Sequence, residues 1–447
     1  MRKLRPFVLA LIAFVIIAAT GGAWLFFAAS FEGEKPILKF DQDISAIGLQ
    51  KVFNITFMDR KSGLRNTVIT IVQDNKTTIL SSIDYPQKGI KKKSLSLMID
   101  PLSLKLHDGK ATLSISAVDY SLRKNKTGFT KPVNIDLTPP QIYLLNPMNN
   151  INPGGTCVIL YRTSEPVLTS GVQVEDYFSP GYPVTLSGKY CFIAYFALPM
   201  HARNGQINIR VVARDHGGNE SSSNIPCLIR DKKFRSDKMN LSESFLQQKI
   251  PEFQLQNPNL RGKTPLEIFA YVNGLMRNDN DKTIRTMCQK TNPRQLWEEI
   301  FLRMKNASPE ALFGDKRTYL YGGKPVGESI HMGVDLASTA HAPVEAANHG
   351  IVAFAGFIGI YGNTILIDHG LGLFTHYAHL GTISVRKGQE VKKGELIGYT
   401  GSSGLAGGDH LHFGVVVGGQ FVNPQEWWDA HWIADNVTKK IELLSGF

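Results

Sequence analysis

The C-terminal part of the chain contains the stretch His410-Leu411-His412-Phe413, in which histidines alternate with apolar residues. Successive side chains of a β-strand point to opposite faces, so this stretch predicts a strand with both imidazoles on one face and Leu411 and Phe413 facing a core. Nine of the 12 histidines lie from His331 onward, in about a quarter of the length. This concentration indicates that some of them do chemistry on a β-sheet.

Upstream, His331 and Asp335 offer an imidazole and a carboxylate four residues apart. Both groups are usual ligands of Zn²⁺, and three such ligands leave a fourth position for water, which is typical of a catalytic site. Structural zinc sites usually close with thiolates, and no cysteine follows Cys288. The residue types therefore predict a catalytic rather than a structural metal site.

Six short blocks follow one another between His331 and Phe413. They are His331-Met-Gly-Val-Asp335, Ile360-Tyr361-Gly362-Asn363, Ile367-Asp368-His369-Gly370, Tyr377-Ala378-His379-Leu380, Gly401-Ser402-Ser403-Gly404 and His410-Leu411-His412-Phe413. In order and spacing they resemble the lysostaphin or LytM-type zinc endopeptidases, over about residues 325–426. The resemblance implies an antiparallel β-sheet metallopeptidase domain with Zn²⁺ as its cofactor.

Carried over residue by residue, the resemblance implies zinc ligation by His331, Asp335 and His412. It implies that His379 and His410 are a non-ligating catalytic pair, whose individual roles the sequence leaves open. The implied reaction is hydrolysis of the peptide cross-links of peptidoglycan by zinc-activated water. The chain departs from the family at Gly414, where a glutamate is usual, and at Asp409, which could supply a substitute acid.

The other histidines and several tyrosines have weaker functional interpretations. His369 and His376 are expected to be structural or to lie at the rim of the site, and His341, His349 and His431 at the surface. Three tyrosines could line the cleft, but we interpret them first as residues that pack against the sheet; they are Tyr319, Tyr321 and Tyr361.

Two other functions compete with the endopeptidase. A non-catalytic envelope adaptor would regulate another wall hydrolase and bind a protein partner through the preceding modules, but all the ligand and catalytic positions are filled. The glycine spacing of residues 385–398 also resembles biotinyl and lipoyl carrier domains, yet Lys392 and Lys393 lack the usual flanking residues. The net charge of +11 indicates an anionic envelope polymer rather than nucleic acid as a long-range partner, or simply a solvated basic surface.

The N-terminus carries Arg2, Lys3 and Arg5 and then runs from Pro6 to Phe31 without a charge. This length predicts one membrane-spanning helix, with a cleavable signal peptide as the alternative. The flanking positive charges predict a cytoplasmic N-terminus, a single pass through the inner membrane and a periplasmic catalytic body.

Between these ends the sequence is mainly β. Asp108-Gly109 is followed by alternating apolar residues and Asp119, and the pattern recurs 96 residues later from Asn204-Gly205 to Asp215, which predicts two immunoglobulin-like β-sandwiches. Helical spacing then predicts a connector, with helices from about Leu241, after Thr264 and near Arg294 to Met304. Four cysteines allow three disulfide pairings. The predicted domains are 1–31 anchor, 32–137 and 138–231 sandwiches, 232–310 connector, 311–430 metallopeptidase and 431–447 tail.

Overall fold

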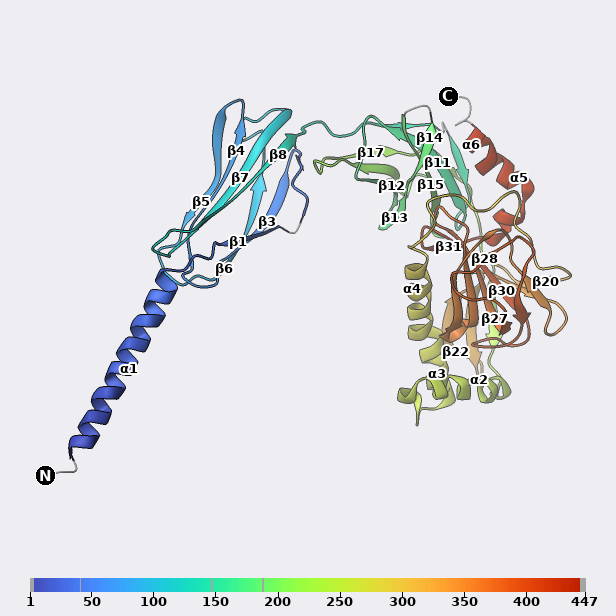
Figure 1. The fold of residues 1–447 in the computed structure, drawn as a ribbon. Coiled ribbons are helices and arrows are strands. Elements are labelled where there is room, and N and C mark those ends of the chain that lie inside the picture. The colour runs from blue at the N-terminus through green and yellow to red at the C-terminus, as the bar shows by residue number, and fades with distance from the viewer. Residues whose placement is uncertain (1–3, 41, 146–147, 187–188, 443–447) are drawn as a thin grey trace. The chain divides into compact units, whose positions relative to one another are not determined.

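The computed structural model describes all residues except 1–3, 41, 146–147, 187–188 and 443–447, and its fold is mainly β (Figure 1). The chain forms two compact units. The first comprises Met1–Pro140 with Arg214–Glu220, and the second comprises Gln141–Ala213 with Ser221–Phe447. The six sequence blocks from His331 to Phe413 all belong to the second unit.

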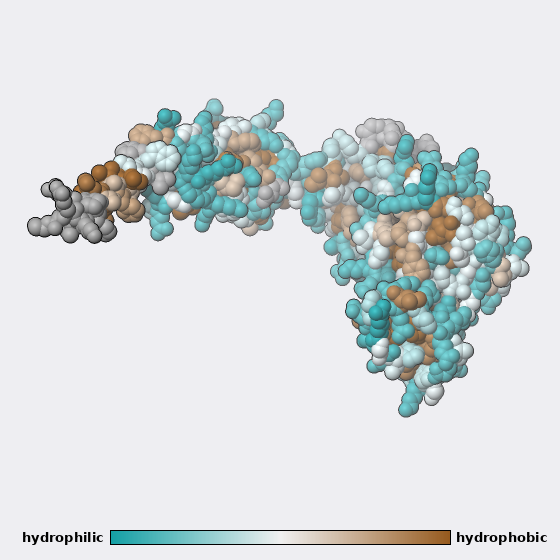
Figure 2. Space-filling view, turned by 60° about the horizontal axis from the view of Figure 1, so that its bottom comes forward, coloured by the Kyte–Doolittle hydropathy of each residue, from teal (hydrophilic) through white to brown (hydrophobic). Residues whose placement is uncertain are grey.

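Helix α1 (Leu4–Ser30) opens the first unit, and its described side chains are mostly apolar and exposed (brown in Figure 2). In the part of the chain that the structure describes, no helix combines the length and the hydropathy needed to cross a bilayer. The predictions of a membrane anchor at residues 1–31 and of an inner-membrane location are therefore wrong.

The rest of the first unit consists of two sheets around one core. In the central strand Gly109–Asp119 the side chains of Ala111, Leu113, Ile115 and Ala117 are buried, as the alternating pattern predicts. In spatial order, one sheet contains β1 (Ile37–Phe40), β3 (Lys51–Met58) and β6 (Lys92–Ile99), and the other contains β2 (Ala46–Ile47), β8 (Lys126–Ile135), β7 (Gly109–Asp119), β4 (Leu64–Gln73) and β5 (Lys76–Asp84).

The second unit begins with another set of small sheets. Ile209, Val211 and Ala213 are buried in the strand that carries the second copy of the repeat, whereas Ile207 precedes it and is half-buried. The four cysteines are free, so none of the three possible pairings is formed. The sheets are β14 (Tyr182–Leu186), β15 (Lys189–Ala197), β11 (Thr156–Thr163) and β9 (Ile142–Leu144); β13 (Tyr177–Pro180), β12 (Thr169–Val174), β16 (Ile209–Arg214) and β17 (Glu220–Asn224); and the parallel pair β10 (Asn149–Ile151) and β18 (Cys227–Ile229).

The connector is partly helical. Thr264 and Glu267 form the capping box that the sequence predicts at the start of a helix, with a proline in its first turn. Before the helices, a short strand pairs in parallel with a strand of the C-terminal part. The elements are β19 (Ser236–Asn240), α2 (Glu243–Gln256), η1 (Pro258–Leu260), α3 (Pro265–Tyr271), the π-helical turn η2 (Val272–Met276) and α4 (Arg277–Met287).

The helix predicted near Arg294 to Met304 does not form. Its backbone amides donate to other segments instead, from Leu296 to His369 O (2.9 Å) and from Phe301 to Trp427 O (3.1 Å). Trp297 and Phe301 are buried in the same hydrophobic cluster as residues of the C-terminal strands. An extended path satisfies the backbone and buries both aromatic rings, so tertiary packing overrides the helical spacing.

The C-terminal part is built on a ten-stranded sheet whose pairings are all antiparallel. Its main path is β20 (Ser308–Ala311), β23 (Val334–Ala337), β30 (Leu411–Val417), β27 (Leu373–Ile383), β26 (Gly362–Asp368), β25 (Gly350–Ile358) and β28 (Glu390–Val391), joined by β24 (Pro343–Glu345), β29 (Leu396–Thr400) and β31 (Gln420–Val422). A smaller sheet holds β19, β21 (Lys316–Tyr321) and β22 (Lys324–Ile330), and short helical turns are η3 (Gly359–Tyr361), η4 (Pro424–Trp428), α5 (Ala430–Ile433), η5 (Ala434–Thr438) and α6 (Lys439–Glu442).

One hydrophobic core joins the second sandwich-like module to the ten-stranded sheet. Leu160 of β11 and Tyr195 of β15 belong to the same buried cluster as Trp427 and the interior residues of that sheet. The rings of Tyr195 and Trp427 lie 6.3 Å apart, and those of Phe301 and Trp427 lie 5.3 Å apart. The module and the sheet therefore fold as one body.

Glu426 is a buried acid in this junction. Its carboxylate accepts hydrogen bonds from the amide of Thr156 (2.8 Å) and from the side chain of Asn152 (3.2 Å). Burial raises the pKa of Glu426 to about 7, and the two hydrogen bonds only partly oppose this. The carboxylate is thus held where ionisation is unfavourable.

Replacing Glu426 with glutamine should make stability less dependent on pH. Because its folded pKa is raised, the contribution of Glu426 to stability is full below about pH 4.5 and falls by up to about 3 kcal/mol as pH rises through 7. Glu426→Gln removes that loss, so its unfolding free energy should exceed that of the wild type at pH 8 but not at pH 4.5. Urea denaturation at both pH values measures the difference. The exposed Glu390→Gln variant is the control, and an equal pH slope in Glu426→Gln and wild type would contradict the argument.

Candidate metal centre and active site

Three side chains of the predicted metal site converge in the second unit. His331 follows β22, and Asp335 on β23 lies directly opposite His412 on the neighbouring strand β30. Asp335 Oδ1 is 2.9 Å from both His331 Nε2 and His412 Nδ1, and these two nitrogens are 3.0 Å apart. Ligands of a tetrahedral zinc ion with bonds of about 2.05 Å lie about 3.3 Å apart, so the three atoms are close to the spacing that such an ion requires.

The chemistry of these donors also fits a cation. His331 Nδ1 donates to the carbonyl oxygen of Leu312 (3.0 Å), which leaves Nε2 of the neutral ring with a lone pair. This lone pair faces the carboxylate of Asp335 and the ring of His412 in a buried environment. Acceptors packed this closely repel one another unless positive charge lies among them. The three residues could therefore hold a divalent metal ion with N and O ligands.

Arg317 forms an ion pair with the carboxylate of Asp335. Its Nη2 is 3.1 Å from Asp335 Oδ2, so Oδ1 remains directed at the two imidazoles. Burial would raise the pKa of Asp335, but His331 and the other histidines at Oδ1 outweigh it and hold that pKa well below its usual range. The carboxyl is thus ionised, as a metal ligand must be. Nothing in the sequence around Arg317 marks this role.

His379 and His410 lie beside the trio, with ring centroids 4.9 Å apart. His379 Nδ1 donates to Ser403 O and His410 Nδ1 donates to Gly408 O, both at 2.9 Å. The Nε2 atoms remain for a substrate or water, and that of His410 is 3.6 Å from Asp335 Oδ1. The structure thus brings together all five residues that the family resemblance implies.

The two imidazoles differ in their electrostatic surroundings. Burial lowers the pKa of His379 well below its usual value, and His410 and His412 lower it further. Burial also lowers the pKa of His410, but the nearby carboxylate of Asp335 outweighs it, so the net shift is upward.

The backbone of His379 is strained. Its φ of +61° lies in the left-handed region, which non-glycine residues rarely adopt. Such conformations are costly and are retained where the surrounding structure enforces them, often at active sites. Here the hydrogen bond to Ser403 O holds the imidazole on this turn of the chain.

The connector packs against the loop that holds His379. The Lys249 amine of α2 donates to Ser402 O, and Glu252 of the same helix accepts from the amide of Gly404 (3.1 Å). Ser403, between these two contacts, is the acceptor for His379. Helix α2 therefore fixes the position of a candidate catalytic histidine.

The five residues open into a cavity of about 570 Å³. Phe245 and Gln248 of α2 form part of its wall, opposite Ala406 and Gly407. Of the three tyrosines considered from the sequence, Tyr319 and Tyr361 line the cavity, whereas Tyr321 does not and instead donates to Glu243.

The remaining histidines are placed as follows. His369 is buried between His349 O and Thr375 Oγ1, both 2.7 Å away, which is a structural position. His376 is buried with both ring nitrogens unpartnered among the described residues, against Tyr361 and His412. Exposed or half-exposed positions away from the metal ligands are occupied by His341, which stacks on Tyr399, His349, which contacts Glu298, and His431.

The two departures from the family pattern have structural counterparts. Gly414 lies opposite His376 in the ladder, and a Cβ atom at Gly414 would approach the His376 side chain to 3.3 Å. Asp409 accepts from the amide of His341 (3.1 Å) and is half-buried. The suggestion that Asp409 replaces the missing acid at the ligands is therefore not supported by its contacts.

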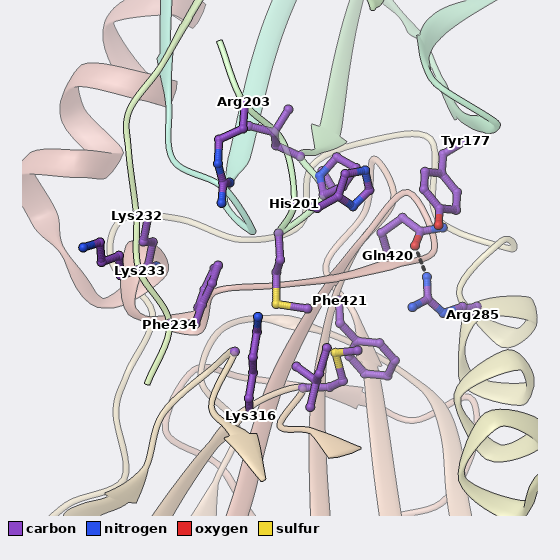
Figure 3. A pocket seen from close by; sticks show the side chains of 17 residues that line it. Tyr177, His201, Arg203, Lys232, Lys233, Phe234, Arg285, Lys316, Gln420 and Phe421 are labelled. Carbon is purple, nitrogen blue, oxygen red and sulfur yellow. Dashed lines mark hydrogen bonds between the residues drawn. The ribbon is translucent and has the colours of Figure 1, made fainter. Parts of the chain in front are cut away.

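A second cavity, of about 580 Å³, lies in the same unit and has different chemistry (Figure 3). Basic side chains line it, including Arg203, Lys232, Arg285 and Lys316, and no acidic residue does. Arg285 donates to Gln420, and the Lys232 amine lies 5.1 Å from the centre of the Phe234 ring. None of the three clustered metal-ligand residues belongs to this lining.

Residues 329–424 match the sequence model of Peptidase family M23, so the chain carries an M23 peptidase domain at its C-terminal end. The "DD-carboxypeptidase/endopeptidase Mpg" of Neisseria meningitidis is 43% identical over 95 residues, which are 21% of this chain and 22% of that protein. The "Peptidoglycan DD-endopeptidase ShyA" of Vibrio cholerae is 39% identical over 93 residues, again 21% and 22%. The predicted resemblance to this family of peptidases is confirmed.

A solved structure of the catalytic domain of the antimicrobial peptidase lysostaphin from Staphylococcus simulans is 30% identical, with a TM-score of 0.24. The similarity covers 28% of this chain and 92% of that one. The chain matches about a fifth of the length of its curated relatives. The matches to those relatives thus concern the C-terminal domain.

Proposed function

We propose that this protein is a zinc-dependent endopeptidase that hydrolyses peptide cross-links of peptidoglycan. One observation carries the proposal: two imidazole nitrogens and a carboxylate oxygen converge within 3.0 Å of one another at the wall of a cavity that also holds His379 and His410. His331, Asp335 and His412 are the proposed zinc ligands. Zinc is favoured because two imidazoles and one carboxylate are a typical ligand set of catalytic zinc sites.

When bound, zinc supplies a Lewis acid that polarises the peptide carbonyl and acidifies water. The chain's own residues orient and move protons around it. Arg317 pairs with Oδ2 of Asp335 and leaves Oδ1 directed at the ligand position. The Nε2 atoms of His379 and His410 lie on the same side, where one accepts a proton from the attacking water and returns it to the leaving amine. The other donates to the developing oxyanion.

The substrate is inferred from the relatives. Proteins that share the C-terminal domain carry the names DD-carboxypeptidase/endopeptidase and peptidoglycan DD-endopeptidase, which supports a peptide bond of peptidoglycan as the target here. The cavity, with aromatic side chains from Phe245, Tyr319 and Tyr361, has room for a peptide segment. We expect no role for nucleic acid.

The test is metal content and hydrolysis in the same preparation. The full chain should contain about one zinc per molecule by mass spectrometry and release new amino groups from purified peptidoglycan sacculi, and His412→Ala should lose both. A wild-type chain that binds zinc but does not hydrolyse sacculi would contradict the proposed enzymatic activity. If His412→Ala also captured a wall hydrolase as well as the wild type does, the alternative of a non-catalytic adaptor would be favoured. A wild-type chain that binds no zinc would overturn the proposal.

A further inference from the structure

The first unit contains a cluster of three acidic residues, which lies far in sequence from the six blocks between His331 and Phe413. Glu32 lies in the segment between α1 and β1, Asp59 directly follows β3 and Asp119 ends β7. One carboxylate oxygen from each lies within 4.8 Å of the others. The three residues are 4%, 2% and 0% exposed, so three acidic groups share a space from which water is excluded.

Two carboxylate oxygens of this cluster have no hydrogen-bond donor among the described residues. Glu32 Oε1 accepts from the amide of Ser62 (2.6 Å), and Asp59 Oδ1 accepts from the amides of Lys61 (3.1 Å) and Gly63 (2.5 Å). Glu32 Oε2 and Asp59 Oδ2 are buried and have no hydrogen-bond partner within the described residues. Buried carboxylate oxygens without a donor are costly and rare. These two atoms therefore point to a ligand.

Positive side chains do not neutralise the cluster. Within the described residues no lysine or arginine forms an ion pair with Glu32, Asp59 or Asp119, and the nearby Lys61 pairs with Glu34 instead (2.9 Å). The donors that reach the three carboxylates are backbone amides, Ser121 and the Asn125 side chain. The cluster is therefore balanced by hydrogen-bond donors and by the charge of Lys61 at longer range, without a direct ion pair among the described residues.

Oxygens also outnumber hydrogens around Asn125. Its Nδ2 is 2.8 Å from Asp119 Oδ2, 3.0 Å from Glu32 O, 3.1 Å from Glu34 O and 3.1 Å from Ser121 Oγ. An amide group carries two hydrogens, so it cannot satisfy four acceptors. Ser62 Oγ is another buried oxygen without a partner among the described residues. The site is rich in oxygen acceptors and poor in donors.

We propose that Glu32, Asp59 and Asp119 form a Ca²⁺ site. Calcium takes six to eight oxygen ligands from carboxylates, carbonyls and water in flexible geometry, whereas Mg²⁺ demands an octahedral shell and keeps several waters. The cluster offers oxygen and neither imidazole nor thiolate, which separates it from the zinc ligand set. Because Glu32 belongs to the segment that leaves α1, calcium ties residues 31–36 to the ends of β3 and β7.

The second copy of the sequence repeat provides a matched control. Asp215 closes the corresponding turn, where its carboxylate accepts from the amides of Gly218 (2.7 Å) and Asn219 (2.9 Å) and from the Asn219 side chain (2.8 Å). Asp215 belongs to neither of the two candidate metal clusters found in the described residues. Asp215→Asn thus alters the same kind of turn without removing a calcium ligand.

The test is calorimetric titration of Ca²⁺ into the full chain loaded with one equivalent of zinc, with no chelator. The wild type and Asp215→Asn should show one saturable site per chain, and Glu32→Gln and Asp59→Asn should each weaken it at least about tenfold. Both variants remove charge at constant shape, so their melting temperatures in calcium-free buffer should not fall below that of the wild type. Calcium should also slow Glu-C cleavage after Glu34 in the wild type and in Asp215→Asn only.

The calcium site would be overturned if the wild-type chain bound no calcium at millimolar concentration, or if calcium binding survived in both Glu32→Gln and Asp59→Asn. It would also be overturned if Mg²⁺ bound as tightly as Ca²⁺. Loss of binding in Asp215→Asn would equally contradict the assignment, because the turn and not the ligand set would then control it. None of these outcomes bears on the zinc proposal, since the titrated chain already carries its zinc.

Discussion

Replacing Asp335 with alanine should abolish zinc binding and peptidoglycan hydrolysis together. The variant removes the one anionic ligand and leaves Arg317, a partly buried cation, facing two neutral imidazoles. Without the carboxylate, the site carries the positive charge of Arg317 and no negative charge, so it should bind a divalent cation very weakly. Activity should then fall by at least about 10³-fold. Mass spectrometry of bound metal and amine release from sacculi measure the two effects.

Asp409→Asn is the control for this variant. Asp409 is next to the H-x-H block in sequence, but its half-buried carboxylate accepts, among the described residues, only from the amide of His341. It should therefore keep both metal and activity within about twofold of the wild type, since surface substitutions usually have small effects. Metal retained at full stoichiometry in Asp335→Ala would contradict the assignment of the ligands.

The second large effect concerns catalysis without metal loss. His410→Ala and His379→Asn should each keep a full complement of zinc and lower kcat by about 10² to 10⁴, with a much smaller change in KM. Asparagine is chosen at position 379 because it tolerates the left-handed backbone conformation better than alanine, so the fold is disturbed less.

The exposed His431→Ala variant controls for the loss of an imidazole as such. It should match the wild type in metal content and rate. Full activity in both His379→Asn and His410→Ala would exclude the pair from proton transfer. Loss of zinc in either variant would instead assign that histidine to the metal.

The sequence predicts the centre of the site well because its geometry is local to a β-ladder. His410 directly precedes β30 and His412 lies within it, so alternation places both on one face, and the pairing of β23 with β30 sets Asp335 opposite His412. These contacts depend on strand periodicity and on one register, both of which leave a pattern in the sequence. The family blocks supplied the remaining positions.

The supporting residues leave no such pattern. Arg317 sits in a strand of another sheet and reaches Asp335 only after the two sheets pack. Lys249 acts through a backbone carbonyl more than 150 positions away, and no spacing encodes that contact. His376 was expected to be structural or at the rim, and its burial against His412 depends on strand pairing and on the absence of a side chain at Gly414.

Two errors have related causes. The stretch from Arg294 to Met304 has helical spacing, yet its aromatic residues are held in an extended path by partners far along the chain. The length of the uncharged N-terminal stretch predicts a membrane anchor, but no helix in the described part of the chain has the length and hydropathy that a membrane span needs. Local patterns report propensity, and long-range packing does not follow from propensity alone.

The core shared by β11, β15 and the catalytic strands limits how this peptidase can be rearranged. Residues 329–424 carry the ligands, but Tyr195 and Leu160 lie outside that range and pack in the same cluster as Trp427. A chimera that transplants only the family segment onto another scaffold would expose this apolar face and lose the α2 brace on the Ser403 loop. Recombination of this chain with its relatives is therefore expected to fail at cuts within the second compact unit.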